Sequence, residues 1–209
     1  MKYIVWDFNG TIIDDASLCL SIENYMLKER NMKTDYSLAW YKDNFCFPVY
    51  DYYLKLGYTF TDETYDEMAD EFNLLYNQRF HECKLHEGFI ETIQKAIDKG
   101  YKNIILSASH KENLIRQVDS LGITQYFEEL IGIDDYLAGS KTDHAKKWFA
   151  QNAIDPRDCI LIGDSTHDAD TAKALGIEKC FLVSFGHQSH KVLKDYGDLV
   201  VDSFEEIEL

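Results

Sequence analysis

The chain has 209 residues, of which 45% are hydrophobic and 14% aromatic, a composition typical of a packed globular protein rather than a disordered acidic chain. Its 37 acidic residues outnumber its 21 basic ones and leave a formal net charge of −16, which argues against nucleic acids and anionic membrane surfaces as partners. The sequence contains no apolar run long enough for a membrane span and no CxxC pair among its five scattered cysteines, so we expect a reduced, cytoplasmic protein without a disulfide framework or zinc site.

Short apolar runs typical of buried strands alternate with helical patterns along most of the chain. The expected strands are Tyr3–Trp6, Ile104–Leu106, Leu130–Ile133, Ile160–Ile162, Phe181–Val183 and Leu199–Val201. The expected helices are Gly88–Lys99, Lys111–Leu121, Thr142–Asn152 and Asp168–Leu175, and Gly100, Gly122 and Gly176 are placed to end three of them. This alternation predicts an α/β fold with a Rossmann-like parallel sheet, whose chemistry lies at the carboxyl ends of the strands.

The stretch from residue 14 to residue 86 interrupts this alternation. It has helix-like segments at Ala16–Arg30 and Asp62–Glu82, no convincing strand, and roughly half of the aromatic residues. A small helical lobe that gains buried area from large rings explains most of these aromatics. A lid whose rings line a substrate pocket explains the few that face a cleft. We predict an α/β core domain of residues 1–13 and 87–209 and an inserted helical cap domain of residues 14–86.

Carboxylates follow two of the expected strands directly. Asp7 ends the first strand, and Asp164 follows the strand at Ile160–Ile162, with Asp168 four residues later at the start of a helix. If these two strands are neighbours, the three carboxylates converge and repel one another unless a cation binds, and an all-oxygen set suits Mg²⁺. Helix capping explains Asp164 or Asp168 alone, but it does not explain two matching strand-end turns.

Two further strand-end features fit a phosphoryl group. The strand at Ile104–Leu106 leads into Ser107-Ala108-Ser109, a hydroxyl-rich turn that can donate hydrogen bonds to phosphate oxygens. Lys141 opens a helix, where its ammonium group can neutralise phosphoryl charge. Each feature alone is common, so their value lies in the shared sheet edge.

Taken in order, these residues resemble the haloacid dehalogenase (HAD) superfamily, in particular its phosphoglycolate-phosphatase-like group with a helical, C1-type cap. Asp7-Phe8-Asn9-Gly10-Thr11 is similar to the first motif DxDGT, Ser107 and Lys141 match the second and third motifs, and Gly163-Asp164-Ser165-Thr166-His167-Asp168 is similar to the fourth motif GDxxxD. The resemblance spans nearly the whole chain and implies an HAD-like core that carries this cap.

The resemblance implies a phosphatase that acts on a small phosphorylated metabolite. Asp7 would attack phosphorus and become an aspartyl phosphate, while Ser107 and Lys141 would bind the transferring phosphoryl group. Gly10, Thr11 and Ala108 would complete the phosphate site. Mg²⁺ would be held by Asp7, Asp164 and the backbone carbonyl of Asn9, with Asp168 in support. Asp14 matches a position that is commonly acidic in capped members.

Asn9 departs from the family pattern. Most phosphatases of the family have a second Asp there, which protonates the leaving alkoxide and then activates the hydrolytic water. The carboxamide of Asn9 cannot exchange a proton at neutral pH. The loss of positioned acid–base catalysis typically costs about 10²–10⁴-fold in rate.

Four explanations of Asn9 stay open. The substrate has a good leaving group, or another acid such as His110 or His167 serves the reaction. The reaction is phosphonatase-type C–P cleavage, which would need a cap lysine such as Lys42 or Lys55. The protein is a catalytically impaired relative that binds a phosphorylated ligand or a partner. Finally, the Asn9-Gly10 dipeptide deamidates and restores an Asp.

Overall fold

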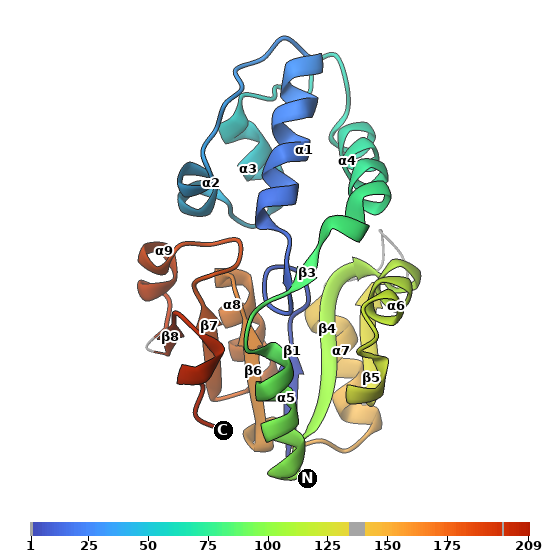
Figure 1. Ribbon diagram of the computed structural model, residues 1–209, viewed down its shortest axis with the longest axis vertical. Coiled ribbons are helices and arrows are strands. Elements are labelled where there is room, and N and C mark those ends of the chain that lie inside the picture. Colours follow the sequence, from blue (N-terminus) through green and yellow to red (C-terminus); the bar gives the residue numbers. More distant parts are fainter. Residues whose placement is uncertain (1, 134–140, 198) are drawn as a thin grey trace.

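The computed structural model describes residues 2–133, 141–197 and 199–209, and its main feature is a six-stranded sheet (Figure 1). The strand order is β5-β4-β1-β6-β7-β8, and every pairing in it is parallel. The strands are β1 (Tyr3–Trp6), β4 (Lys102–His110), β5 (Glu129–Ile133), β6 (Cys159–Gly163), β7 (Lys179–Val183) and β8 (Val200–Val201). The predicted fold class is therefore confirmed.

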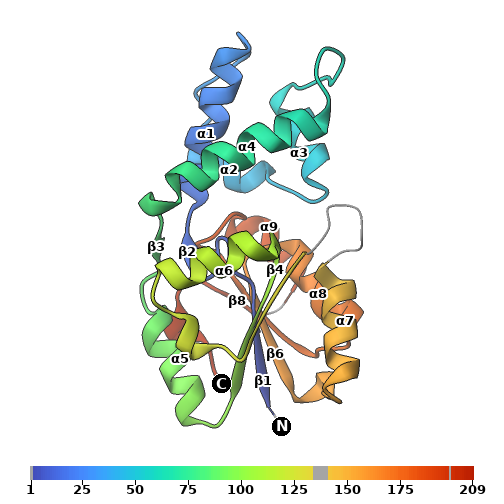
Figure 2. The ribbon, with the colours of Figure 1, turned by 90° about the vertical axis from the view of Figure 1, so that its right-hand side faces the viewer.

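Helices cover both faces of this sheet, as parallel strands joined by crossover helices require. Helices α5 (Phe89–Asp98) and α6 (Lys111–Ser120) lie on one face, and α7 (Lys141–Gln151) and α8 (Thr166–Leu175) lie on the other (Figure 2). A short helix, α9 (His190–Lys194), follows β7. Gly100, Gly122 and Gly176 have φ values of 82°, 67° and 81°, which confirms their predicted left-handed role at helix ends.

A second group of helices lies beyond the carboxyl edge of the sheet (Figure 1). It contains α1 (Ala16–Glu29), α2 (Leu38–Asn44), α3 (Val49–Leu56) and α4 (Tyr65–Arg79). Helix α4 begins later than predicted because Thr64 and Glu67 form a capping box, and its end continues as the short turn η1 (Phe80–Glu82). Helices α2 and α3 were not predicted, since each is too short to show a clear helical period.

Two short antiparallel strands connect the helical group to the sheet. Strand β2 (Ile13–Asp14) pairs with β3 (Lys84–Leu85), so the expectation of no strand between residues 14 and 86 is wrong. Two-residue strands have no periodic pattern that a sequence could show. The pairing holds the outgoing and returning chain side by side, and the division into two domains stays a prediction.

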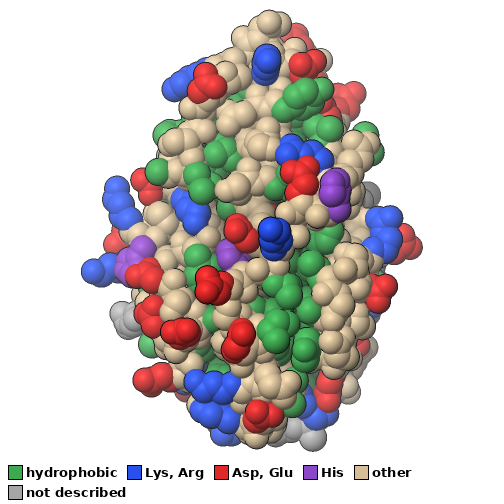
Figure 3. Space-filling model, viewed as in Figure 1, with side chains coloured by type: hydrophobic (Ala, Val, Ile, Leu, Met, Phe, Trp, Pro, Cys, Tyr) green, Lys and Arg blue, Asp and Glu red, His purple; other side chains and the backbone are tan. Residues whose placement is uncertain are grey.

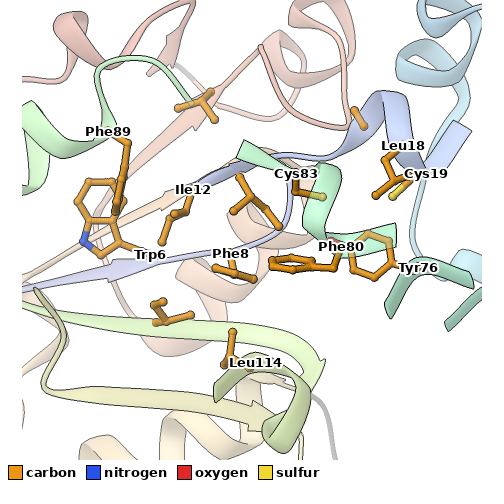
Figure 4. Close-up of a cluster of buried hydrophobic side chains, with 14 of the residues drawn as sticks. Trp6, Phe8, Ile12, Leu18, Cys19, Tyr76, Phe80, Cys83, Phe89 and Leu114 are labelled. Carbon is orange, nitrogen blue, oxygen red and sulfur yellow. The ribbon is translucent and has the colours of Figure 1, made fainter. Parts of the chain in front are cut away.

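The hydrophobic core continues from the sheet into the helical group (Figure 4). Trp6 of β1 and Phe89 of α5 pack edge to face, with ring centroids 5.4 Å apart. Phe80 and Tyr76 extend the same cluster toward α1, where Cys19 lies. The helical group is therefore joined to the sheet by a shared hydrophobic core as well as by the connecting strands β2 and β3.

None of the described helices is long and apolar enough to cross a membrane. On the face shown in Figure 3, basic side chains are interspersed with acidic ones.

Candidate active site

Three carboxylates meet at the carboxyl edge of the sheet. Strands β1 and β6 are neighbours, with Trp6 opposite Ile162, and Asp7 continues the ladder by donating its backbone N–H to the Ile162 carbonyl at 2.9 Å. Side-chain oxygens of Asp7, Asp164 and Asp168 lie within 4.8 Å of one another. The structure therefore brings together the acids that the sequence placed at two separate strand ends.

The ammonium group of Lys141 lies between two of these acids. Its Nζ donates to Asp7 Oδ1 at 2.7 Å and to Asp168 Oδ1 at 2.5 Å, and the lysine is only 4% exposed. Burial opposes its charge, but the two carboxylates raise the pKa of Lys141 above its usual value. The first residue of α7 thus supplies a fixed positive charge at the centre of the site.

The carboxylates themselves carry more negative charge than this lysine neutralises. Burial and the nearby Asp168 raise the pKa of Asp7 well above its usual value. Burial, together with the Asp168 charge, raises the pKa of Asp164 to about 6. Burial also opposes the charge of Asp168, yet Lys141 and a hydrogen bond from the Ser165 hydroxyl hold its pKa below the usual value. An all-oxygen site with excess negative charge fits Mg²⁺.

Glycines let the backbone approach these carboxylates closely. A Cβ at Gly186 would overlap Oδ2 of Asp164, and a Cβ at Gly163 would overlap the side chain of Asp168. Gly10 has a φ of 73° and also packs against Asp164, so no other residue fits there without strain. The positions of the acids are therefore fixed by packing as well as by hydrogen bonds.

The side chain of Asn9 is held by three partners. Its Nδ2 donates to Asp15 Oδ2 at 2.9 Å and to the Tyr76 hydroxyl at 2.8 Å, and its Oδ1 accepts from the Ser109 hydroxyl at 3.0 Å. The Tyr76 hydroxyl in turn donates to Asp15 Oδ2 at 2.6 Å. Position 9 is thus an amide with both its donor and its acceptor used, beside a carboxylate that a second Asp would repel.

Asp15 forms a buried ion pair with His187. The distance from His187 Nε2 to Asp15 Oδ1 is 3.1 Å, and the other ring nitrogen lies 2.7 Å from the Tyr41 hydroxyl. Burial disfavours the imidazolium, but Asp15 raises the pKa of His187 to about 9. The same pairing overcomes burial and lowers the pKa of Asp15. The backbone N–H of His187 also donates to Asp164 Oδ2 at 2.5 Å, which links this pair to the carboxylate cluster.

Sequence reasoning missed Asp15, Tyr76 and His187. It singled out the neighbouring Asp14, which is exposed, whereas Asp15 is fully buried. The one available signal was the adjacent pair of acids after the first motif, Asp14 and Asp15. Neighbouring side chains in an extended segment point to opposite sides, so only one of the two can face the site. Nothing local marks Tyr76 or His187, which reach the site from distant parts of the chain.

A cavity of about 340 Å³ separates this sheet edge from the helical group. Asp7, Asn9, Ser107, Ala108 and Lys141 line its sheet side. Strand β4 continues through residue 110, so the segment Ser107–Ser109 is the irregular end of a strand rather than the expected turn. Its register with β5 shifts between Leu106 and His110, as in a β-bulge.

Two predicted phosphate ligands lie behind the cavity wall rather than in it. The Gly10 backbone N–H donates to Asp15 Oδ1 at 2.8 Å, and the Thr11 hydroxyl lies 3.4 Å from Asp164 Oδ1. Of the two histidines considered as acids, His110 lines the cavity. His167 stacks on Phe47 with ring centroids 4.7 Å apart and lies outside the cavity wall.

Comparisons with known proteins agree with this architecture. Residues 4–182 match the profile of the family described as haloacid dehalogenase-like hydrolase. A haloacid dehalogenase-like hydrolase from Streptococcus pneumoniae superposes with a TM-score of 0.82 at 18% identity and covers 99% of this chain and 96% of its own. A haloacid dehalogenase-like protein of Agrobacterium tumefaciens gives 0.80 at 18% identity, with 99% and 95% covered. These structural likenesses show the fold.

Curated relatives carry the names of phosphatases. A phosphoglycolate phosphatase of Mesorhizobium japonicum is 30% identical over 57% of this chain, and the match spans about half of that relative, 53% of its length. A phosphoglycolate phosphatase of Haemophilus influenzae is 23% identical over 99% of this chain and 96% of its own. A pyrophosphatase of Halalkalibacterium halodurans is 21% identical, with 98% and 94% covered.

Proposed function

Because the chain belongs to the haloacid dehalogenase-like hydrolase family, we propose that it is a Mg²⁺-dependent phosphatase of a small phosphorylated metabolite. The observation that carries this proposal is the position of Asp7, which lies in the cavity wall with its Oδ1 held 2.7 Å from Lys141 Nζ. Ser107 lines the same cavity. The site therefore combines one nucleophile, Asp7, with two groups that bind oxyanions, Ser107 and Lys141.

In this mechanism Asp7 attacks phosphorus and forms an aspartyl phosphate while Ser107 and Lys141 bind the phosphoryl oxygens. The ester P–O bond breaks with its electron pair on the leaving oxygen, which takes a proton from water because Asn9 has none to give. Since Lys141 is anchored by Asp168, its charge is in place before substrate arrives and needs no reorganisation. Water then attacks the phosphorus of the intermediate and releases phosphate and the free Asp7 carboxylate. Ala108 lines the cavity beside Ser107, whereas Gly10 and Thr11 lie behind its wall and support the site through hydrogen bonds to Asp15 and Asp164.

Mg²⁺ would be held by Asp7, Asp164 and the backbone carbonyl of Asn9, with Asp168 in a supporting role. When bound, the ion supplies Lewis-acid polarisation of the phosphoryl oxygens. Asp168 supports the site by fixing Lys141 and by accepting the N–H and hydroxyl hydrogen bonds of Ser165. The raised pKa values of Asp7 and Asp164 support this assignment, because burial disfavours the charge of both carboxylates and Lys141 contacts only Asp7 of the two.

The proposal includes the domain organisation and the cellular setting expected from the sequence. Residues 14–86 form a cap domain over a core of residues 1–13 and 87–209, and the cavity lies between them. All five cysteines are free, which supports a reduced, cytoplasmic location.

Two alternatives compete with the phosphatase. Phosphonatase-type C–P cleavage needs a cap lysine in the cavity, but neither candidate lines it: Lys42 Nζ binds the Phe185 carbonyl at 2.7 Å, and the exposed Lys55 binds the Asn44 carbonyl. A catalytically impaired relative that binds a phosphorylated ligand or partner is favoured by one observation, the amide at position 9.

Deamidation of Asn9 is opposed by the engagement of its Nδ2 and of the Gly10 N–H with Asp15.

The test is a Mg²⁺-dependent phosphate-release assay on the protein and on Asp7→Asn, with an aryl phosphate and a panel of metabolite phosphates. We expect Asp7→Asn to lower kcat by at least about 10³-fold, because the nucleophile is lost. It should also raise the melting temperature, because a buried carboxylate whose pKa is raised is replaced by a neutral isostere.

Equal turnover by Asp7→Asn would overturn the assignment of the nucleophile. If the unmodified protein releases no phosphate from any ester but binds one of them in a manner that depends on Lys141, the ligand-binding alternative is correct instead.

A further inference from the structure

The cavity above Asp7 has two unlike walls. Its sheet side carries the phosphoryl chemistry, whereas its helical side is built largely from aromatic rings. Tyr53 and Tyr65 line that side with ring centroids 6.2 Å apart, and Phe72 lies parallel to Tyr76 at 6.0 Å. Phe45 lines the cavity as well and stacks on Tyr41, with ring centroids 5.4 Å apart. These rings are packed against one another and are therefore in place before any ligand enters.

The cavity has few cations that could bind a second anionic group of a substrate. Within the part of the chain that the structure describes, Lys141 is the single Lys or Arg that lines the cavity, and it is bound by Asp7 and Asp168. The segment 134–140 contains neither Lys nor Arg. His187 also lines the cavity, and it is paired with Asp15.

The catalytic carboxylates in the cavity would repel a second anionic substituent. Asp15 and Glu23 also line the cavity and supply no cation, since Asp15 is paired with His187 and burial raises the pKa of Glu23 to about 8. A carboxylate or second phosphate beside the transferring phosphoryl group would be desolvated here without a partner, which is strongly unfavourable. Amides at Asn73, Asn77 and Gln117 line the cavity as well and provide hydrogen bonds for neutral polar groups.

The volume suits one ring in addition to the phosphoryl group. A dry cavity of about 150 Å³ is enough for benzene, and this cavity measures about 340 Å³. Resting on the proposed phosphatase function, we infer that the substrate is an aryl phosphate monoester, whose aromatic ring carries no charged substituent. Such an ester differs from phosphoglycolate and pyrophosphate, which each carry a second anionic group.

The amide at position 9 supports this substrate class independently. Asn9 cannot protonate the leaving oxygen, and an alkoxide is a poor leaving group because its alcohol is about as weak an acid as water. A phenol has a pKa of about 10, so a phenolate leaves without a proton. The Asp7 carboxylate forms the new P–O bond, and the aryl O–P bond breaks with its electron pair on the aryl oxygen. The phenolate then takes a proton from water, and a water molecule hydrolyses the aspartyl phosphate.

Binding of two unreactive phosphonates tests the ring preference without relying on turnover. Benzylphosphonate carries a ring, and phosphonoacetate carries a carboxylate on the same methylene. Titration calorimetry in Mg²⁺ should give a Kd for benzylphosphonate at least about 10-fold lower than for phosphonoacetate. Equal or inverse affinities would overturn the inference, whether or not the protein is a phosphatase.

Two cavity variants sharpen this test. Phe72→Leu keeps an apolar side chain but removes a ring, so it should weaken benzylphosphonate binding severalfold and leave phosphonoacetate unchanged. Asn73→Arg places a cation at the exposed rim of the cavity and should strengthen phosphonoacetate binding about 10-fold. Leu74→Arg is the matched control, because Leu74 is 59% exposed on the same helix and does not line the cavity.

Kinetics then separate the inference from the proposed function. Phenyl phosphate should exceed 2-phosphoglycolate in kcat/KM by at least about 100-fold, and benzyl phosphate should match the KM of phenyl phosphate at a lower kcat. Faster turnover of 2-phosphoglycolate would overturn the substrate class but leave the phosphatase intact. Tight benzylphosphonate binding with no turnover of any ester would instead overturn the phosphatase.

Discussion

The two walls of the cavity are built on different principles. On the sheet side Asp7, Lys141 and Asp168 are buried charges that hydrogen bonds fix at distances of 2.5–2.7 Å. On the helical side, Tyr53 packs on Tyr65 and Phe72 on Tyr76, with ring centroids 6.2 and 6.0 Å apart. Shape rather than charge decides these contacts. Under the proposed function the two walls have separate tasks: the sheet edge would set which bond is broken, and the ring wall would set which molecule carries that bond.

The largest effect in the comparison is expected at Lys141. Lys141→Met should lower kcat by about 10²–10³-fold, the range found for the loss of one oxyanion donor. It should also cost about 3 kcal/mol of unfolding free energy, because Asp7 and Asp168 stay buried without their shared cation.

Phosphate release in Mg²⁺ measures the change in kcat, and urea unfolding in EDTA measures the change in unfolding free energy. Lys146→Met on the exposed side of the same helix is the control, and it should change neither. If Lys141→Met unfolds like its control, the charge at the sheet edge is not held as the distances imply.

A smaller effect is expected at position 9, where the two walls meet through Tyr76. Asn9→Asp would place a second carboxylate beside buried Asp15 and remove the donor to both Asp15 and Tyr76. We expect it to lower the unfolding free energy by about 1–3 kcal/mol and to leave kcat on alkyl phosphates unimproved.

The double variant Asn9→Asp/Asp15→Asn exchanges the amide and the carboxylate. It should recover at least half of the lost stability and raise kcat on alkyl phosphates about 10-fold or more, since the carboxylate at position 9 is then relieved of its repulsion. Thermal melts and alkyl phosphate kinetics on the four proteins of this cycle give the coupling. A single variant that is both stable and more active would show that Asp15 does not control position 9.

The smallest effect is expected at Glu23, on the helical side. Burial raises the pKa of Glu23 to about 8, although the Tyr52 hydroxyl donates to it at 2.6 Å. Because the folded-state pKa lies above the unfolded value, Glu23 favours the folded state at low pH, and this contribution is lost as pH rises toward 8.

Glu23→Gln should therefore flatten the fall in melting temperature between pH 5 and pH 8.5. The gain at pH 8.5 relative to pH 5 should be at least about 2–4 °C, the shift that 1 kcal/mol causes in a domain of this size. Differential scanning calorimetry at the two pH values measures it, with the exposed Glu29→Gln on the same helix as control. Equal gains at both pH values would mean that Glu23 is charged throughout.

The sequence by itself determined the sheet, the edge that carries the chemistry, and four motif positions on it. The reason is local: a buried parallel strand is a short apolar run, and a residue that follows it directly must lie at the carboxyl edge. Asp7 and Asp164 could therefore be placed without coordinates, and the neighbouring β1 and β6 brought them together.

Only the tertiary structure decided what surrounds Asn9 and what faces Asp7 across the cavity. Asp15, Tyr76 and His187 are separated by up to 172 positions in the chain yet share hydrogen bonds or an ion pair, and no periodic pattern encodes such a meeting. The rings of α2, α3 and α4 could be counted from the sequence. Which of them line the cavity depends on how the helices pack over the sheet edge. A large apolar ring suits a core position and a cavity wall equally well, so the residue type alone does not distinguish the two.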